Sequence, residues 1–231
     1  MSEPALKGRV VLVTRPGGGG EKLAAALRGA GAEVHLYPAL RIDVGPAPDA
    51  EPFDAAAFDR LLFTSRNGVL GLSSTMVAWD GLPPCWAVGN ATAALIEAQG
   101  GKVWVTGTNR GMADLAEQVL TEDPPTGLRV LWLRGQLAHR EALSPLLAAG
   151  AVIEDRVVYR TLNRFLEEGP PPEDILDRVD LVHFASPSAV TFLFEVLTPS
   201  QRERLRVHAS YLAQGPTTQA ACEAAWADPR P

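Results

Sequence analysis

Short apolar runs alternate with segments of helical pattern along the whole chain of 231 residues. The predicted strands are RVVLVT (9–14), AEVHLY (32–37), DRLLFTS (59–65), PCWAVG (84–89), KVWVTG (102–107), LRVLWLRG (128–135), AVIEDRVVYRT (151–161), VDLVHFAS (179–186) and HASYLAQG (208–215). Short continuous apolar strands separated by helices are typical of parallel sheets that are covered on both faces. The sequence therefore predicts an α/β fold.

The order of these elements is repeated within the chain. Residues 12–34 align with residues 131–153 without a gap, and the later strand ends recur in the same order. The matched pairs are Arg15 with Arg134, Ser65 with Ser186, Gly89 with Gly215, and Thr92 with Thr218. Self-similarity on this scale predicts two related domains rather than a solenoid.

The repeated strand ends are candidate binding positions, because ligands of open α/β sheets lie beyond the carboxyl ends of the strands. The segments there are FTSRNG, VGNAT, FASPSA and QGPTT. Ser or Thr at such a position can cap the next helix, while the same helix start offers N–H donors to an anion. Capping alone explains any single junction, but four junctions in matched pairs favour a shared binding cleft.

Composition and charge limit the classes of partner. The net charge of −6 argues against nucleic acid, which needs a basic face. No apolar run approaches the ~20 residues that cross a bilayer, and the N-terminus lacks the features of a secretory signal. Cys85, Cys222 and the four histidines fit no metal-binding spacing. We therefore expect a cytoplasmic protein with no membrane segment and no metal site.

A glycine-rich segment, PGGGGEK (16–22), follows the first predicted strand. It resembles a phosphate cradle, but it fits neither G-x-G-x-x-G nor the Walker pattern, because Leu23 stands where Ser or Thr belongs. We predict a flexible loop here, with nucleotide binding as the lesser alternative.

Taken together and in order, several segments resemble the uroporphyrinogen-III synthase family. They are FTSRNGV, VGNATAAL, LRGQLAHREAL, VVYRT, FASPSAV and GPTTQAA. The resemblance runs from about residue 9 to residue 226, and its specificity lies in the ordered set. It implies a cofactor-free lyase of tetrapyrrole (haem) biosynthesis that cyclises hydroxymethylbilane to uroporphyrinogen III. Water would be lost and ring D inverted, through an azafulvene and a spiro-pyrrolenine intermediate. The small-molecule substrate is the partner implied, and we expect a monomer.

The resemblance also implies two flavodoxin-like lobes that are joined by a two-strand hinge and have the active site in the cleft between them. Carried over, lobe one comprises residues 1–37 and 163–231, lobe two residues 42–157, and the hinge residues 38–41 and 158–162. We expect lobe one to lack its last strand and helix, with four strands in its sheet against five in lobe two.

Site residues follow from the matched motifs. Tyr159 and Thr218 match positions with a catalytic role, Tyr159 by helping the hydroxyl to leave. The predicted substrate-binding residues are Thr64, Ser65, Gly89, Asn90, Thr92, Arg134, Arg140, Ser186, Ser188, Gly215 and Thr217. The substrate carries eight carboxylates, and the arginines, together with Arg15 and Arg66, would offset the acidic net charge of the chain locally. A solvated surface charge is the simpler interpretation of each. Ala185 departs from the family pattern, which often has a hydroxyl side chain there.

Two other classes of function stay open. A non-catalytic member would bind a tetrapyrrole or small anion in the same cleft without turnover. A two-lobed binding protein of the periplasmic type would also have a hinge and a cleft, but it would need an export signal.

Overall fold

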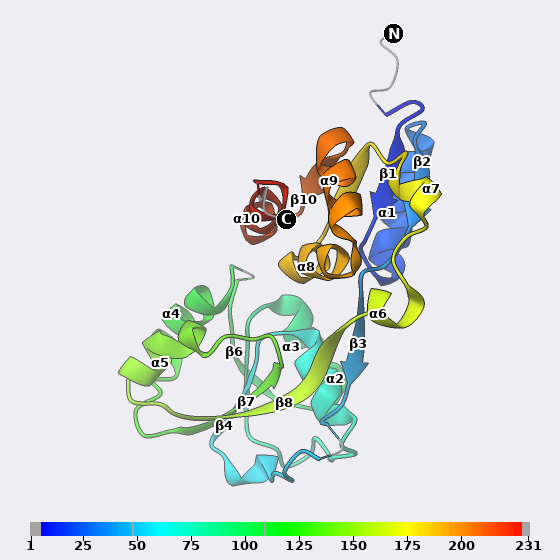
Figure 1. The fold of residues 1–231 in the computed structure, drawn as a ribbon. Coiled ribbons are helices and arrows are strands. Elements are labelled where there is room, and N and C mark those ends of the chain that lie inside the picture. The colour runs from blue at the N-terminus through cyan, green and yellow to red at the C-terminus, as the bar shows by residue number, and fades with distance from the viewer. Residues whose placement is uncertain (1–5, 48, 109, 228–231) are drawn as a thin grey trace. The chain divides into compact units, whose positions relative to one another are not determined.

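The computed structural model describes residues 6–47, 49–108 and 110–227. It divides into two compact units: unit 1 comprises residues 1–41 and 162–231, and unit 2 comprises residues 42–161. Each unit is built on a mainly parallel β-sheet with helices against it (Figure 1), which confirms the predicted α/β class.

The chain passes from one unit to the other inside two strands, β3 (Leu40–Val44) and β8 (Val152–Asn163). The hinge at residues 38–41 and 158–162 stays a prediction. No helix of the described residues is both long enough and apolar enough to cross a membrane.

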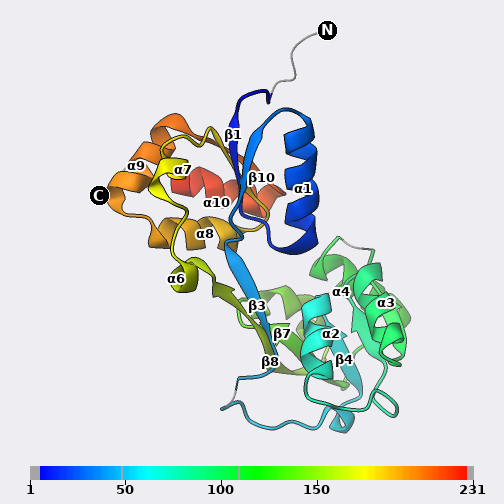
Figure 2. The same cartoon turned by 90° about the vertical axis from the view of Figure 1, so that its right-hand side faces the viewer.

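Unit 1 has a sheet of four parallel strands in the order β10-β9-β1-β2. These strands are β1 (Val10–Val13), β2 (Glu33–Leu36), β9 (Leu181–Phe184) and β10 (Ser210–Ala213). The first strand of the chain therefore pairs with β9, and β9 pairs in turn with β10, the last strand. Figures 1 and 2 show β1 and β10 in the same unit, although they are far apart in sequence.

Helices cover both faces of this sheet. The side chains of β1 alternate between the two faces, so each face has its own core. Val11 and Val13 face α1 (Gly17–Gly29), whereas Leu12 belongs to the core on the other face. That second core contains residues of α8 (Pro187–Val196) and α10 (Pro216–Ala227). The remaining helices of the unit are α6 (Phe165–Glu168), α7 (Glu173–Leu176) and α9 (Pro199–His208).

Unit 2 has a sheet of six strands in the order β3-β8-β7-β4-β5-β6. Its remaining strands are β4 (Arg60–Phe63), β5 (Cys85–Ala87), β6 (Val103–Thr106) and β7 (Arg129–Gly135). The helical segments are α2 (Arg66–Ser73), α3 (Asn90–Ala98), α4 (Met112–Glu122), α5 (Ser144–Ala148) and the short 3-10 turns η1 (Ala55–Ala57) and η2 (Arg140–Leu143).

Alternation along the strands again gives this sheet two cores. Leu61 and Phe63 pack with α2 and α3 on one face, while Leu62 and Trp132 pack with α4 and α5 on the other. Strands buried on both faces explain why their sequences read as continuous apolar runs.

Two predictions about the elements are wrong. The sheet of unit 2 has six strands rather than five, because β3 joins it beside β8, and the chain just after β3 bonds there too, from the Gly45 N–H to the Val158 carbonyl at 2.8 Å. The glycine-rich segment is not a flexible loop but the first turn of α1, which starts at Gly17. A Cβ at Gly20 would overlap the carbonyl oxygen of Arg15, so glycine lets this helix begin directly against the end of β1.

The sheet of unit 1 has the four strands expected within the described residues. The predicted lack of a further strand and helix after α10 concerns positions that lie outside the described residues.

Candidate functional site

In unit 2, the predicted site residues follow neighbouring strands. Thr64 and Ser65 follow β4, Gly89 follows β5, Arg134 is the last residue but one of β7, and Tyr159 lies in β8. Because these four strands are successive neighbours that run in parallel, the carboxyl ends of β4, β5 and β7 lie along one edge of the sheet, and Tyr159 of β8 pairs with Gly135 at that edge. That edge is where open α/β sheets bind ligands.

Ser65 links two features of this edge. It is the N-cap of α2, and its Oγ accepts a hydrogen bond from the Gly68 N–H at 3.3 Å. The same Oγ donates to the hydroxyl oxygen of Tyr159 at 3.1 Å. Ser65 is therefore a helix cap, as the simpler interpretation has it, and also a contact of the predicted catalytic tyrosine.

The ring of Tyr159 fits against Gly135, a residue that the sequence did not single out. The register between β7 and β8 shifts at this point, so that Gly135 pairs with Tyr159. A Cβ built on Gly135 would lie 2.7 Å from the Tyr159 hydroxyl oxygen. Glycine at this position therefore permits the tyrosine ring to occupy its place.

Arg134 and Arg140 both bond to one carboxylate, that of Asp155. The distances are 2.7 Å from Arg134 Nε and 2.6 Å from Arg140 Nη1. Two guanidinium groups against one carboxylate leave a single net positive charge. Asp155 was not predicted. The sequence carried only a weak signal for it, namely its place among several charged residues of β8.

Thr64 and the second junction of unit 2 complete this edge. The Thr64 hydroxyl accepts a hydrogen bond from the indole N–H of Trp132 at 3.4 Å. Gly89 is the N-cap of α3 in extended backbone and has no side chain to cap it, so the first N–H groups of α3 lack that partner. Asn90 is exposed, whereas Thr92 is only 7% exposed.

Unit 1 carries the matching junctions after β9 and β10. Ser186 is the N-cap of α8 and accepts a hydrogen bond from the Ala189 N–H at 3.3 Å. Ser188 lies in the first turn of α8 and is partly exposed. Gly215 precedes α10 with a left-handed φ of 89°. Of the two threonines that follow, Thr217 is exposed but Thr218 is only 1% exposed.

The electrostatics near the end of β9 are unusual because a histidine is buried there. His183 is 6% exposed, and its Nδ1 has no hydrogen-bond partner among the described residues. Burial lowers the pKa of His183, and the positive charge of Arg15 lowers it further. Arg15 itself donates to the side chain of Gln214 at 3.2 Å.

The structure thus brings Thr64, Ser65, Gly89, Arg134 and Tyr159 to one edge of unit 2, and it places the serine and glycine junctions of unit 1 at the equivalent edge of that unit's own sheet. Arg140 bonds to Asp155 and, from its Nη2, to the Ile153 carbonyl at 2.8 Å, both within β8. Arg66 is exposed and makes no hydrogen bond or ion pair within the described ranges.

Comparison with known proteins gives one family. The family model described as uroporphyrinogen-III synthase HemD matches residues 21–229. A curated relative, the uroporphyrinogen-III synthase of Synechococcus elongatus, is 32% identical over 172 residues, which make up 70% of this chain. The match spans only 64% of that relative's own length.

Solved structures are similar in fold. A mutant uroporphyrinogen III synthase from Thermus thermophilus has a TM-score of 0.63 at 21% identity, covering 95% of this chain and 89% of the other. A uroporphyrinogen-III synthetase from Helicobacter pylori has a TM-score of 0.55 at 17% identity, covering 94% and 98%. At 21% and 17% sequence identity, the similarity to these structures is evidence of the fold alone.

Proposed function

Because the chain belongs to the uroporphyrinogen-III synthase family, we propose that it cyclises hydroxymethylbilane to uroporphyrinogen III, with loss of water and inversion of ring D. The observation that carries the proposal is the hydrogen bond from Ser65 Oγ to the Tyr159 hydroxyl. It holds a proton donor at the ligand-binding edge of a parallel sheet, on a residue that matches the family motif.

We propose that this hydrogen bond positions the Tyr159 hydroxyl, whose proton is available to a second acceptor when Ser65 is the donor. We assign that proton to the hydroxyl group that leaves the bilane. The C–O bond breaks, the hydroxyl departs as water with the proton of Tyr159, and a protonated azafulvene (an azafulvenium cation) and the tyrosinate remain. The last pyrrole gives up a ring proton when the macrocycle closes, and this proton restores the tyrosine.

Fixed N–H and hydroxyl donors suit the rest of the task. The bilane is reactive and cyclises unaided to the uninverted isomer, so the enzyme has chiefly to hold one geometry. The starts of α2, α3, α8 and α10 offer N–H groups and positive dipole ends to its carboxylates. The net positive charge of the Arg134–Asp155–Arg140 group adds to this attraction.

The two threonines of α10 divide the remaining roles. We assign substrate binding to the exposed hydroxyl of Thr217, and Thr218 keeps its predicted catalytic role as a proposal. Since Thr218 is 1% exposed, little of its surface is available to a ligand.

We further propose that the protein acts in the cytoplasm as a monomer, on a small-molecule substrate and without a nucleic-acid partner. The net charge of −6 supports the last point.

The test is direct. The purified full chain is incubated with freshly prepared hydroxymethylbilane, and isomers I and III of the product are separated by chromatography after oxidation. We expect isomer III with the protein and isomer I in buffer alone. Isomer I in both samples, from a protein with a cooperative thermal melt, would indicate a non-catalytic binding module instead.

A further inference from the structure

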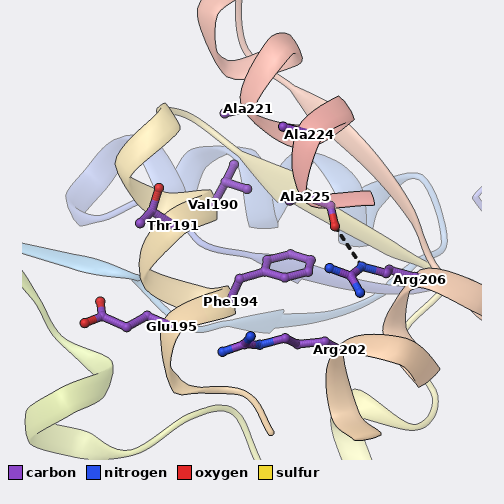
Figure 3. A pocket seen from close by; sticks show the side chains of 9 residues that line it. All are labelled: Val190, Thr191, Phe194, Glu195, Arg202, Arg206, Ala221, Ala224 and Ala225. Carbon is purple, nitrogen blue, oxygen red and sulfur yellow. Dashed lines mark hydrogen bonds between the residues drawn. The ribbon is translucent and has the colours of Figure 1, made fainter. Parts of the chain in front are cut away.

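A cavity of about 480 Å³ lies in unit 1 between α8, α9 and α10 (Figure 3). This volume falls within the roughly 300–1,000 Å³ of ordinary small-molecule sites. The cavity is lined by Val190, Thr191, Phe194, Glu195, Arg202, Arg206, Ala221, Ala224 and Ala225. None of these residues belongs to the proposed substrate site.

One part of the cavity is apolar. α8 contributes Val190 and the ring of Phe194, while α10 contributes only alanines. Because alanine side chains are short, the two helices leave space between them that bulkier residues would fill. An apolar body of a ligand would bury its surface here.

The opposite part of the cavity is cationic. Arg202 and Arg206 both extend from α9 toward the ring of Phe194 (Figure 3). The guanidinium of Arg206 is held in place: its Nε donates to the Ala225 carbonyl at 2.7 Å, and its Cζ lies 5.5 Å from the Phe194 ring centroid.

Arg202 lacks such partners. Its Nε is buried without a hydrogen bond, and within the described part of the chain its guanidinium forms no ion pair. A buried donor that stays unpaired destabilises the fold, so this group is poised to accept a partner that brings its own oxygen atoms.

The charges that face the cavity favour an anion. Glu195 is the single carboxylate in the lining, and one of its oxygens already accepts a hydrogen bond from Asn163 Nδ2 at 3.0 Å. Two guanidinium groups and one carboxylate leave one net positive charge in the lining, since the neutral amide of Asn163 does not neutralise Glu195. Glu203, 3.9 Å from Arg206 Nη1, has a side chain that is 66% exposed.

We propose that this cavity binds a small carboxylate that carries an apolar body. The carboxylate takes the free N–H groups of Arg202, and the apolar body lies against Phe194 and the alanines of α10. This proposal does not rest on the proposed function, because its residues and its readout are separate from catalysis.

The test is a binding titration of the full chain with 4-phenylbutyrate, followed by amide chemical shifts in nuclear magnetic resonance. We expect saturable shifts confined to α8, α9 and α10. The neutral 4-phenylbutyramide has nearly the same shape, and it should bind at least tenfold more weakly. Arg202→Gln should weaken 4-phenylbutyrate roughly 10- to 150-fold, the range for a hydrogen bond to a charged group.

Arg204→Gln is the matched control, because Arg204 lies on the same helix but pairs with Asp177 and Glu173. It should leave the affinity unchanged. Ala224→Met, which fills the cavity from α10, should abolish the shifts. The proposal is overturned if no saturable shifts occur, if the amide binds as tightly as the carboxylate, or if the two arginine variants bind alike.

Discussion

The two units build one junction alike and another differently. Ser65 in unit 2 and Ser186 in unit 1 are both N-caps, with φ and ψ of −160° and 159° in the first and −156° and 157° in the second. Each accepts a hydrogen bond at 3.3 Å from the N–H three residues later. The glycines of the Gly-x-x-Thr junctions differ instead: φ is −169° at Gly89 and 89° at Gly215.

The difference shows what a repeated motif fixes. A capping hydroxyl must reach the N–H groups of its helix, so the serine side chain selects one extended backbone conformation. Glycine has no side chain to place and tolerates both signs of φ, so the same motif permits two chain paths. Repeated serines therefore predict repeated geometry, whereas repeated glycines predict only that a tight junction occurs.

The units differ in chemistry as well. Ser65 bonds to Tyr159, whereas Ser186 bonds only within its own helix start in the described residues. We infer that unit 2 supplies the proton for catalysis.

Tyr159→Phe should have the largest effect. It removes the hydroxyl but keeps the ring against Gly135, so folding should persist while proton donation is lost. We expect isomer III to form about 10- to 150-fold more slowly, as for one hydrogen bond to a charged group that is made only in the transition state. Chromatographic rates, beside a thermal melt, measure this.

Tyr211→Phe in unit 1 is the control for that experiment, since the Tyr211 hydroxyl contacts only the exposed side chain of Gln219 at 3.4 Å. If Tyr159→Phe forms isomer III at the wild-type rate, the inference that unit 2 supplies the proton for catalysis is wrong. Complete inactivity of the folded variant would contradict a mechanism that relies mainly on positioning.

Gly215→Ala should be the most destabilising of the junction changes. Nothing lies within 4 Å of the added Cβ, so the cost is that of a left-handed residue, about 1–3 kcal/mol. Gly29→Ala is matched in space but has an ordinary helical φ, and it should be neutral or stabilising. Urea unfolding measures the stability of both variants. If Gly215→Ala is as stable as Gly29→Ala, the left-handed backbone at Gly215 has no energetic cost, and the difference between the two glycine junctions has no consequence for stability.

These glycines show which features of the fold the sequence could predict and which it could not. Apolar runs gave the strands, and the serine pair gave two equivalent helix starts, because both signals are local. The sign of φ at Gly215, the helical start at Gly17 and the added strand β3 were not predictable. The place of β3 depends on backbone that is distant in sequence, since β3 lies beside β8 and Gly45 bonds to the Val158 carbonyl. The start of α1 depends on how closely Gly20 approaches the Arg15 carbonyl.

The site divides in the same way. Ser65 and Tyr159 could be named from their motifs, but their mutual hydrogen bond requires β4 and β8 to flank β7. Asp155 and Gly135 were missed because neither residue type stands out in sequence. Their roles arise only from the register of β7 with β8.

Ser65→Ala and Ser186→Ala should destabilise by similar amounts. Each removes one N-cap, which costs about 1 kcal/mol. Ser65→Ala should slow the formation of isomer III more than Ser186→Ala, because Ser65 also contacts Tyr159 whereas Ser186 is predicted only to bind substrate. Urea unfolding and the isomer assay separate the two effects. Equal slowing in both variants would mean that the hydrogen bond to Tyr159 contributes nothing to catalysis.

Thr217→Val and Thr218→Val test the accessible against the buried hydroxyl of α10. We expect Thr217→Val to slow the reaction by about 2- to 10-fold, the effect of one ordinary hydrogen bond, and to leave the melting temperature unchanged. Since Thr218 is 1% exposed, Thr218→Val should act less on the rate. A larger rate loss in Thr218→Val than in Thr217→Val would support the catalytic role proposed for Thr218.

The smallest effect concerns pH. In unit 1, burial lowers the pKa of His183 from its ordinary value of 6.5. When the pH falls below 6.5, this histidine therefore takes up a proton in the unfolded chain more readily than in the folded chain. The stability of unit 1 should therefore fall as the pH drops from about 7 toward 5. In unit 2, the Arg60 guanidinium lowers the pKa of Asp123, so that contribution persists until the pH falls below the ordinary value of 3.8.

His183→Gln keeps the backbone carbonyl that accepts from Thr14 but removes the titrating ring. Hydrogen exchange at pH 7.5 and 5.5, corrected for intrinsic rates, reports the opening of β9 and of β4 separately. We expect the acid-induced loss of protection in β9 to shrink in the variant, while β4 behaves as in the wild type. The same pH dependence in β9 of both proteins would show that another group of unit 1 takes up the proton, and that the burial of His183 costs no stability in this range.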